Sequence, residues 1–378
     1  MSVLTINGRL RLRRTRWHDG HDCVTPADAR LDEAQATVSQ GVREMLCRLN
    51  QHSASFAATA ENLKRTACLD ISKETVRRLV EAEGKAVLTQ MQRGQRTPPW
   101  QARDCKTPQG KTRVSVGCDG VKVPLVTDEE KRKRRTRVQA KRQRRGRKCR
   151  PLPRAKAGAD QRYKEFRLGV FSDEAQKHRY VSVTRGDHEV TGRMLWNMAE
   201  AVQLLKADER VANIDGAPWI RNQIEFHGLT QDIGLDFYHL KDNVQKSRRI
   251  VFGEESPEGK AWLDGVLEAF GKSGYDAGWD RLVAWRSGLR HPKRAEADRL
   301  LNYVSERREM IRYPAFRAKG WQIGSGPTEA PCQSTTQRVK GRGRRWNAEN
   351  AAGIMALSCL HNSDGWPRYW KTLSSTKT

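Results

Sequence analysis

The sequence predicts a mixed α/β protein, in which helices cover the faces of one β-sheet. Residues 113–187 hold three consecutive strand-like segments, which favours an antiparallel meander. Strands and helices then alternate up to residue 240, which favours parallel strands joined by right-handed crossovers. Residues 254–315 are mostly helical in period. Together these observations place a mixed sheet, with helices packed on it, in the last two thirds of the chain.

The N-terminal region is predicted to be a hairpin followed by helices. Residues 1–28 begin with an Asn-Gly turn between alternating runs. Residues 29–84 are helical in period, and Ser72 is placed to cap a helix that ends at Gly84. The basic side chains of that helix suit a helix-turn-helix that enters a DNA groove, although a plain helical hairpin fits the segment equally well. They are Lys73, Arg77 and Arg78.

Two polar segments follow. Residues 85–112 contain prolines and few apolar side chains, and predict a linker or an extended strap along DNA. Residues 131–150 hold 13 Lys and Arg and no acid. Because like charges repel, we expect a mobile basic loop over residues 131–156, and a nucleic-acid contact is favoured over a merely solvated patch. The contact residues that we expect there are Lys131, Arg132, Arg134, Arg135, Arg144 and Arg145.

The remaining elements alternate in type. Strands are predicted at 113–123, 162–173, 178–187, 210–216 and 234–240, with helices at 191–205 and 218–227. Pro218 suits the first turn of the second helix. A final large segment, which contains residues 321–360, ends in an apolar helix.

Composition narrows the function classes. The net charge is +27, which favours a polyanionic partner through counterion release. Mean hydropathy is −0.80, no apolar run reaches the roughly 20 residues of a membrane span, and no secretory signal is recognisable, so a soluble cytoplasmic protein is expected. The eight cysteines include no C-x2-C pair, which excludes an obvious disulfide framework or zinc site.

Three acidic residues are the candidates for catalysis. Asp119 and Asp215 each follow a strand-like run and precede a glycine, and Glu329 lies in "GSGPTEA". If the two strands are neighbours, the aspartates meet, and a divalent cation would neutralise them. A third carboxylate would let two ions bind about 3.5–4 Å apart, as phosphodiester chemistry uses them. Taken singly, each Asp-Gly is more often only a turn.

These motifs resemble those of the DDE transposases of bacterial insertion sequences. The residues that carry the resemblance are "GCDGVKVPL", "NIDGAPWI" and "IGSGPTEA". Asp236 and His239 form a D-x2-H arrangement similar to that of the Mutator-like branch, and "RVKGRGRRWN" is similar to the ISKra- and ISLre-type groups. Relatives often carry a C-x2-C pair after the hairpin; only Cys23 stands there in this chain, so we predict no zinc.

The resemblance implies an RNase H-like core at residues 113–250 and 319–378, interrupted by an all-helical insertion at 251–318. It implies two Mg²⁺ ions, for which Mn²⁺ can substitute, held by Asp119, Asp215 and Glu329. His239 would act at the scissile phosphate, or else pack at the end of a strand. Asp236 would support His239.

The same resemblance implies double-stranded DNA as partner, at element ends and at the target, and a homodimer or larger assembly in the bacterial nucleoid. Cations interleaved with glycine suit phosphates, and an aromatic side chain after them suits a stacked base, although the tryptophan can equally belong to the core. These residues are Arg338, Lys340, Arg342, Arg344, Arg345 and Trp346. The alternatives are an RNase H-like nuclease or resolvase that cuts without joining, and a non-catalytic DNA-binding protein.

Overall fold

Five strands form the central sheet, in the order β7-β6-β5-β8-β9. The computed structural model describes residues 2–26, 37–146 and 151–375. The strands are β5 (Arg113–Pro124), β6 (Tyr163–Ser172), β7 (Arg179–Thr184), β8 (Glu209–Ile214) and β9 (Asp232–Leu235). β5, β6 and β7 pair antiparallel, whereas β8 pairs parallel with both β5 and β9. The predicted mixed sheet is therefore confirmed.

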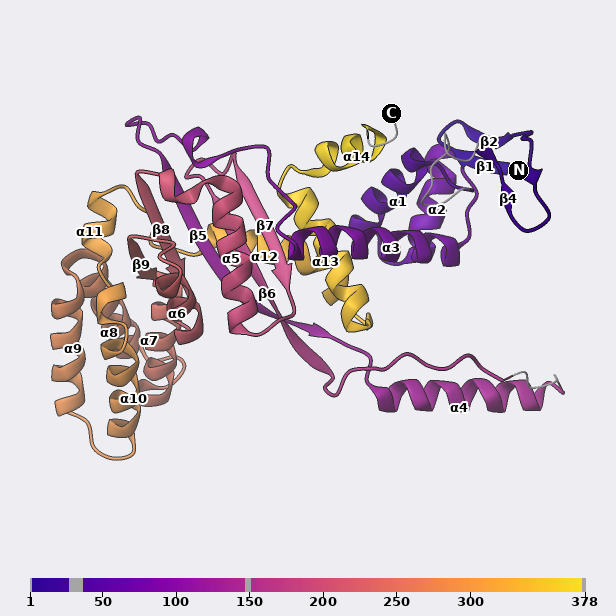
Figure 1. Cartoon of the computed structure of the whole chain (residues 1–378). Coiled ribbons are helices and arrows are strands. Elements are labelled where there is room, and N and C mark those ends of the chain that lie inside the picture. The colour runs from indigo at the N-terminus through magenta and orange to yellow at the C-terminus, as the bar shows by residue number, and fades with distance from the viewer. Residues whose placement is uncertain (1, 27–36, 147–150, 376–378) are drawn as a thin grey trace.

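Helices cover both faces of this sheet (Figure 1). α5 (His188–Val202) joins β7 to β8, and α6 (Pro218–Phe226), with Pro218 in its first turn, joins β8 to β9. Side chains of α5 share one core with Val114 and Val116 of β5. Val181 and Val183 of β7 belong to the opposite core. Because both faces are covered, most residues of these strands are buried.

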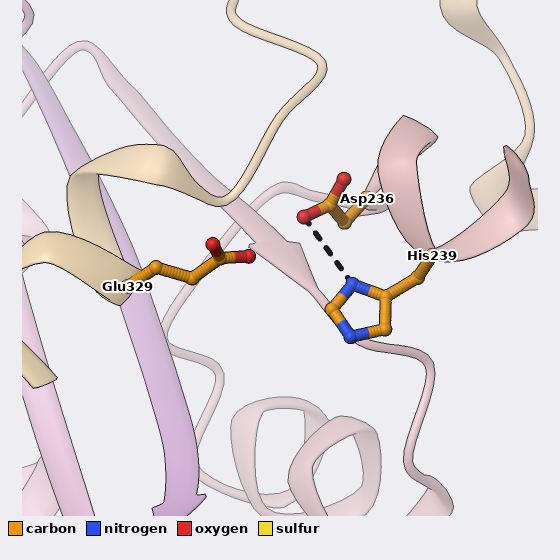
Figure 2. A group of neighbouring side chains, drawn as sticks. All are labelled: Asp236, His239 and Glu329. Atoms are coloured by element: carbon orange, nitrogen blue, oxygen red, sulfur yellow. Dashed lines mark ion pairs between the residues drawn. The ribbon is translucent and has the colours of Figure 1, made fainter. Parts of the chain in front are cut away.

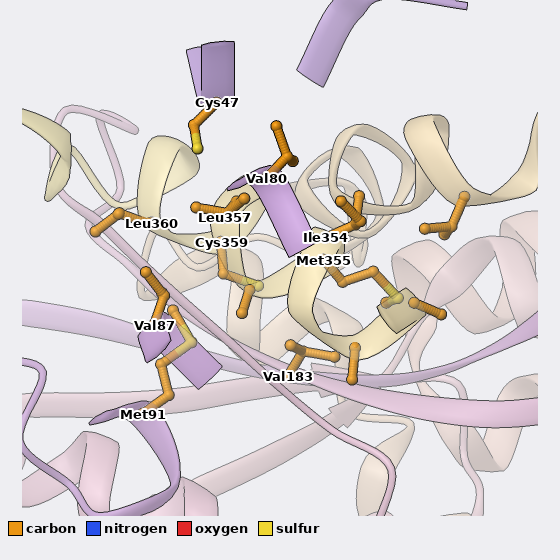
Figure 3. Close-up of a cluster of buried hydrophobic side chains, with 14 of the residues drawn as sticks. Cys47, Val80, Val87, Met91, Val183, Ile354, Met355, Leu357, Cys359 and Leu360 are labelled. Atoms are coloured by element: carbon orange, nitrogen blue, oxygen red, sulfur yellow. The ribbon is translucent and has the colours of Figure 1, made fainter. Parts of the chain in front are cut away.

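The core that contains Val181 and Val183 joins the N-terminal helices to the C-terminal helices (Figure 3). α3 (Lys73–Gln92) runs through Gly84, so the prediction that it ends there was wrong. A Cβ on Gly84 would lie 2.6 Å from the carbonyl oxygen of Gly353 in α13 (Ala348–Asn362), so the two helices touch backbone to backbone. Gly84 thus serves close helix packing rather than helix termination.

The rest of the N-terminal region follows the prediction in outline. The Asn-Gly hairpin consists of β1 (Ser2–Thr5) and β2 (Gly8–Arg11), and β3 (Trp17–His18) pairs with β4 (Cys23–Val24). α1 (Gln40–His52) and α2 (Phe56–Ala67) precede α3, and Ser72 caps α3 by accepting from the Thr75 amide at 3.2 Å. The part of the predicted helical stretch at 29–36 lies outside the described residues.

Residues 93–112, predicted as a linker or strap, are anchored to the sheet. Trp100 is 3% exposed and its indole nitrogen donates to the carbonyl oxygen of Arg179 at 3.1 Å. The hydroxyl of Tyr180 donates to the carbonyl oxygen of Arg96 at 2.7 Å. The short helix η2 (Ala102–Asp104) belongs to the core beneath α5. These contacts fix the segment along the edge strand β7.

The basic segment is a helix and not the loop that was predicted. α4 (Asp128–Arg144) is capped by reciprocal hydrogen bonds between Thr127 and Glu130, and residues 147–150 lie outside the described residues. Acidic residues at its first turn and basic ones at its last complement the helix dipole, which offsets the repulsion among its cations. α4 buries no side chain and projects from the end of β5 (Figure 1).

The prediction of a strand over residues 234–240 was wrong beyond Leu235. β9 ends at Leu235, and α7 (Phe237–Phe252) begins immediately after Asp236, whose side chain accepts from the Tyr238 amide. An aspartate that caps a helix stops the strand, and this signal outweighs the apolar run around it. The helical block then consists of α8 (Pro257–Glu268), η4 (Ala269–Ser273), α9 (Tyr275–Ser287), α10 (Lys293–Ser305), η5 (Arg308–Met310) and α11 (Tyr313–Ala318).

The C-terminal segment returns to the sheet. α12 (Gly326–Lys340) packs against β5, and α13 and α14 (Trp366–Ser375) follow it. Glu329 lies in the first turn of α12, where the helix dipole favours a carboxylate. Among the residues that the structure describes, no helix is both long and apolar enough to cross a membrane.

Candidate active site

The two candidate aspartates stand on neighbouring strands. β5 and β8 pair parallel from Arg113–Glu209 to Val116–Ala212, with a constant offset of 96 residues. Asp119 and Asp215 are separated by the same offset, so they occupy equivalent positions just beyond the last paired residues. The expected adjacency of the two strands is confirmed. Asp119 lies within β5, which continues to Pro124, and therefore does not close the strand as predicted.

The turn after β8 fixes Asp215. Its Oδ1 accepts from the Ala217 amide at 2.8 Å, and Gly216 has a φ of +83°. A Cβ on Gly216 would lie 2.6 Å from Nε of Arg307, whose guanidinium also donates to the Gly216 carbonyl at 3.0 Å. Only glycine satisfies both the backbone angle and this close approach. The turn and the metal-site interpretations of Asp-Gly are therefore compatible here.

Glu329 reaches the aspartates because α12 lies very close to β5. A Cβ on Gly117 would fall 1.8 Å from Oγ1 of Thr328, so the glycine is what lets the helix approach. Gly117 and Asp119 point to the same face of β5, since side chains alternate along a strand. Glu329, next to Thr328, thereby faces the same space as Asp119. Both line one cavity.

Asp236 and His239 lie on the other side of that space, at the start of α7 (Figure 2). Asp236 is 0% exposed, accepts from the amides of Tyr238 at 2.6 Å and Ser325 at 3.1 Å, and lies 3.3 Å from Nδ1 of His239. Although burial opposes ionisation, the ion pair with His239 and the hydrogen bonds from Ser325 and Tyr238 hold the pKa of Asp236 at about 2. The contact with Asp236 raises the pKa of His239. Asp236 therefore orients the imidazole.

One hydroxyl links the two acidic groups. Oγ of Ser325 contacts Oδ2 of Asp236 and also lies 2.6 Å from Oε1 of Glu329. Because a serine hydroxyl has a single proton, it satisfies one carboxylate fully and not both. A further proton or a bound cation would satisfy the carboxylate oxygen to which the Ser325 hydroxyl does not donate.

The side chains converge on a cavity of about 360 Å³. Burial, together with the neighbouring carboxylates of Asp215 and Glu329, raises the pKa of Asp119, despite a hydrogen bond from Gly120. Ligand atoms of Asp236, His239 and Glu329 lie within 4.8 Å of one another, so this group can hold a metal ion. The oxygen and imidazole donors suit a divalent cation such as Mg²⁺ or Mn²⁺. The donor set thus fits a metal, with Glu329 common to both groups of acids.

Three residues of the site were missed in the sequence. Asp242 lines the same cavity, three residues after His239 and so on the same face of α7. The spacing places His239 and Asp242 on one face only in a helix, whereas the sequence predicts a strand up to residue 240. Ser325 and Gly117 act through tertiary contacts that no local pattern reveals.

The predicted DNA-binding residues of α3 and α4 differ in their surroundings. Lys73 and Arg78 are exposed, whereas Arg77 forms ion pairs with Glu74 and with Glu81 on its own helix. In α4, Arg132 and Arg144 are exposed. Lys131 and Arg135 donate to carbonyl oxygens of residues 152–157, which return alongside the helix. Arg134 is exposed and lines a neighbouring cavity. The exposed residue Arg145 follows α4 directly.

The cations after Glu329 divide into exposed and internal ones. Lys340 and Arg342 are exposed. Arg344 donates to the carbonyl of Arg338, and Arg345 donates to the carbonyl of Leu125 and pairs with Glu130. These contacts tie the loop after α12 to the base of α4.

Two of the predicted DNA contacts are buried. Arg338 is 3% exposed, lies over the rings of Phe56 and Trp346, and donates to the Asn50 carbonyl. Burial lowers its pKa to about 10. Trp346 is 8% exposed and donates to the Val339 carbonyl, so in this conformation it cannot stack on a base. The core interpretation of Trp346 is the correct one, because its ring closes the apolar contact between α2 and the sheet end.

Cationic residues of α3, of α4 and of the end of α12 with its following loop line one common cavity. A cavity of about 440 Å³, here called the basic cavity, lies where α2, α3, the base of α4 and the loop after α12 come together. The cations that line it are Arg77, Lys131, Arg134, Arg338, Arg344 and Arg345.

Comparison with known proteins gives little to add. No family model and no curated protein matches the sequence. Among solved structures the chain is similar to one in the Drosophila P element transposase strand transfer complex, at 11% identity over 89% of this chain and 81% of that chain, with a TM-score of 0.34.

Proposed function

We propose that the chain is a DDE-type transposase with an RNase H-like core, which cuts DNA at the ends of an insertion sequence and joins those ends to a target. The observation that carries the proposal is the alignment of Asp119 with Asp215 on adjacent parallel strands, with Glu329 on the wall of the same cavity. Acids brought together from three separate segments serve no evident packing purpose, and burial, together with the repulsion from Asp215 and Glu329, raises the pKa of Asp119.

Asp119, Asp215 and Glu329 would hold two Mg²⁺ ions, for which Mn²⁺ can substitute. Bound there, the ions supply Lewis-acid activation of the attacking oxygen and stabilisation of the leaving oxygen. The three carboxylates fix the position of the scissile phosphate between two strands and a helix. His239, oriented by Asp236, presents its Nε2 side to the same cavity and donates to a phosphate oxygen when protonated.

The partner in this proposal is double-stranded DNA, which the exposed cations of α3, α4 and the loop after α12 contact through phosphates. Two DNA ends must be held together for joining, so we propose a homodimer or a larger assembly. The cellular place that follows is the bacterial nucleoid.

The test is a strand-transfer assay with purified protein, labelled DNA ends and Mg²⁺ or Mn²⁺. Asp119→Asn and Asp215→Asn are expected to abolish both cleavage and joining while leaving DNA binding in place. Cleavage of branched DNA without joining would support the RNase H-like nuclease or resolvase instead. DNA binding with neither reaction at any metal concentration would leave a non-catalytic DNA-binding protein.

A further inference from the structure

A second cavity continues from the candidate active site along α12. It has a volume of about 600 Å³ and shares Asp119 and Glu329 with the cavity described above. We call it the α12 groove. One wall is β5, at Asp119 and Val121, and the other is the exposed side of α12. The sequence motifs that contain Asp119, Asp215 and Glu329 do not predict a groove along α12.

The α12 wall is a regular row of polar side chains. Gln333, Gln337 and Lys340 are exposed and recur at the spacing of one helix face, with Ser334 beside them. From Glu329 to Lys340 the helix rises about 16 Å, which is the length of about five nucleotides of a stacked strand. Amides both donate and accept, so they suit base edges as well as phosphates.

The far end of the groove meets the basic cavity. Lys340 and Gly341 close the α12 groove, and a Cβ on Gly341 would lie 2.4 Å from the guanidinium carbon of Arg344, which lines the basic cavity. The path therefore runs from carboxylates, past amides, to cations. A phosphate chain held by a cation-neutralised site at one end and by cations at the other would span it.

We propose that the α12 groove binds a single strand of DNA, the one that continues from the scissile phosphate toward Lys340. This rests on the proposed function for the direction of the strand, but the groove can be tested by binding alone. Only one strand carries the phosphate at the acids, and a row of neutral amides between two charged ends suits one chain more than the two backbones of a duplex.

The experiment uses the full chain and a short fluorescent single-stranded oligonucleotide, with Ca²⁺ in place of Mg²⁺ to prevent cleavage. The variant is Gln333→Glu combined with Gln337→Glu, which adds two negative charges to the groove without changing side-chain size. We expect binding to weaken roughly tenfold, because each new carboxylate repels a phosphate. The matched control is Gln92→Glu, at the exposed end of α3 and outside the groove lining.

Lys340→Gln supplies a second readout. Removing one phosphate contact from a single strand is expected to lower the slope of log affinity against log salt by about 0.7. Unchanged affinity in the double variant, an equal loss in Gln92→Glu, or no oligonucleotide binding by the unaltered chain would each overturn the groove assignment.

Cleavage assays on the same proteins separate the two proposals. If the unaltered chain cleaves DNA while the double variant binds and cleaves like it, the proposed function stands and the groove is wrong. If the unaltered chain never cleaves but binding falls in the double variant alone, the groove stands and the transposase proposal fails.

Discussion

Asp119 and Asp215 stand level with each other on adjacent parallel strands, separated by the same 96-residue offset that pairs β5 with β8. The last paired residues are Val116 and Ala212, so the strands no longer pair where the acids lie. Two carboxylates placed in this way destabilise the metal-free protein and attract a cation, and the first prediction follows from that conflict.

Asp119→Asn should weaken metal binding without destabilising the metal-free fold. The raised pKa of Asp119 means that its ionisation costs folding free energy, a penalty that grows as pH rises from the unfolded pKa through the folded one. Without metal, at about pH 8, the variant should therefore melt at the same temperature as the unaltered protein or higher. With Mn²⁺ at about a hundred times its dissociation constant, the unaltered protein should gain about 2.7 kcal/mol, and the variant much less.

Thermal unfolding in EDTA and in Mn²⁺ measures both effects. An equal metal-induced gain in the two proteins would remove Asp119 from the ligand set.

Gly117→Ala should move α12 away from β5. The added methyl overlaps Thr328, so the unfolding free energy should fall by about 1–3 kcal/mol. Displacement of Glu329 by about 1 Å should reduce metal-dependent cleavage about a hundredfold. Urea unfolding and single-turnover cleavage would measure the two losses.

The control for that variant is Gly326→Ala in the same helix, where a Cβ would meet nothing within 4 Å. It should leave stability nearly unchanged. Adding Thr328→Ala to Gly117→Ala should recover part of the activity; no recovery at all would argue against the steric explanation.

His239 should make stability depend on pH. Its pKa is raised by Asp236, so the charged imidazole stabilises the fold fully below the unfolded pKa of about 6.5, and this contribution fades as pH rises through the higher folded pKa. His239→Gln should lower the melting temperature more at about pH 5.5 than at about pH 8.5. The melts are made in EDTA, and a difference independent of pH would contradict the ion pair with Asp236.

Neutralising α4 should weaken DNA binding and spare stability. Arg132→Gln with Arg137→Gln removes two cations from a helix that buries no side chain. If both contact phosphates, the slope of log affinity against log salt on duplex DNA should fall by about 1.8, while the urea midpoint stays the same. Lys272→Gln, in the insertion and paired with Glu268, is the control and should change neither quantity.

The sequence was sufficient for the type of most elements of the mixed sheet and for their order along the chain, because both depend on local signals. Apolar runs of strand length and turn residues are readable one segment at a time, and they located β5 to β8. The end of β9 was missed because Asp236, a helix cap, lies within an apolar stretch that continues into α7. The prediction of a loop at α4 was wrong because the cap formed by Thr127 and Glu130 stabilises the helix against charge repulsion.

The features of the site that the sequence does not predict depend on long-range contacts. Three such contacts join residues distant in the sequence: Gly117 admits Thr328, Ser325 touches Asp236, and Arg338 lies over the ring of Phe56. A basic residue in a glycine-rich stretch has the same local appearance whether it faces solvent or a core. Burial, which decides between them, belongs to the fold as a whole.

The backbone contact between Gly84 and Gly353 limits how this protein can be truncated. Residues 351–360 of α13 are all buried, partly beneath α3, so removing the first 92 residues would expose an apolar helix to water. A truncated chain that lacks the N-terminal helices is therefore expected to aggregate, and the candidate site formed by Asp119, Asp215 and Glu329 would be lost with it.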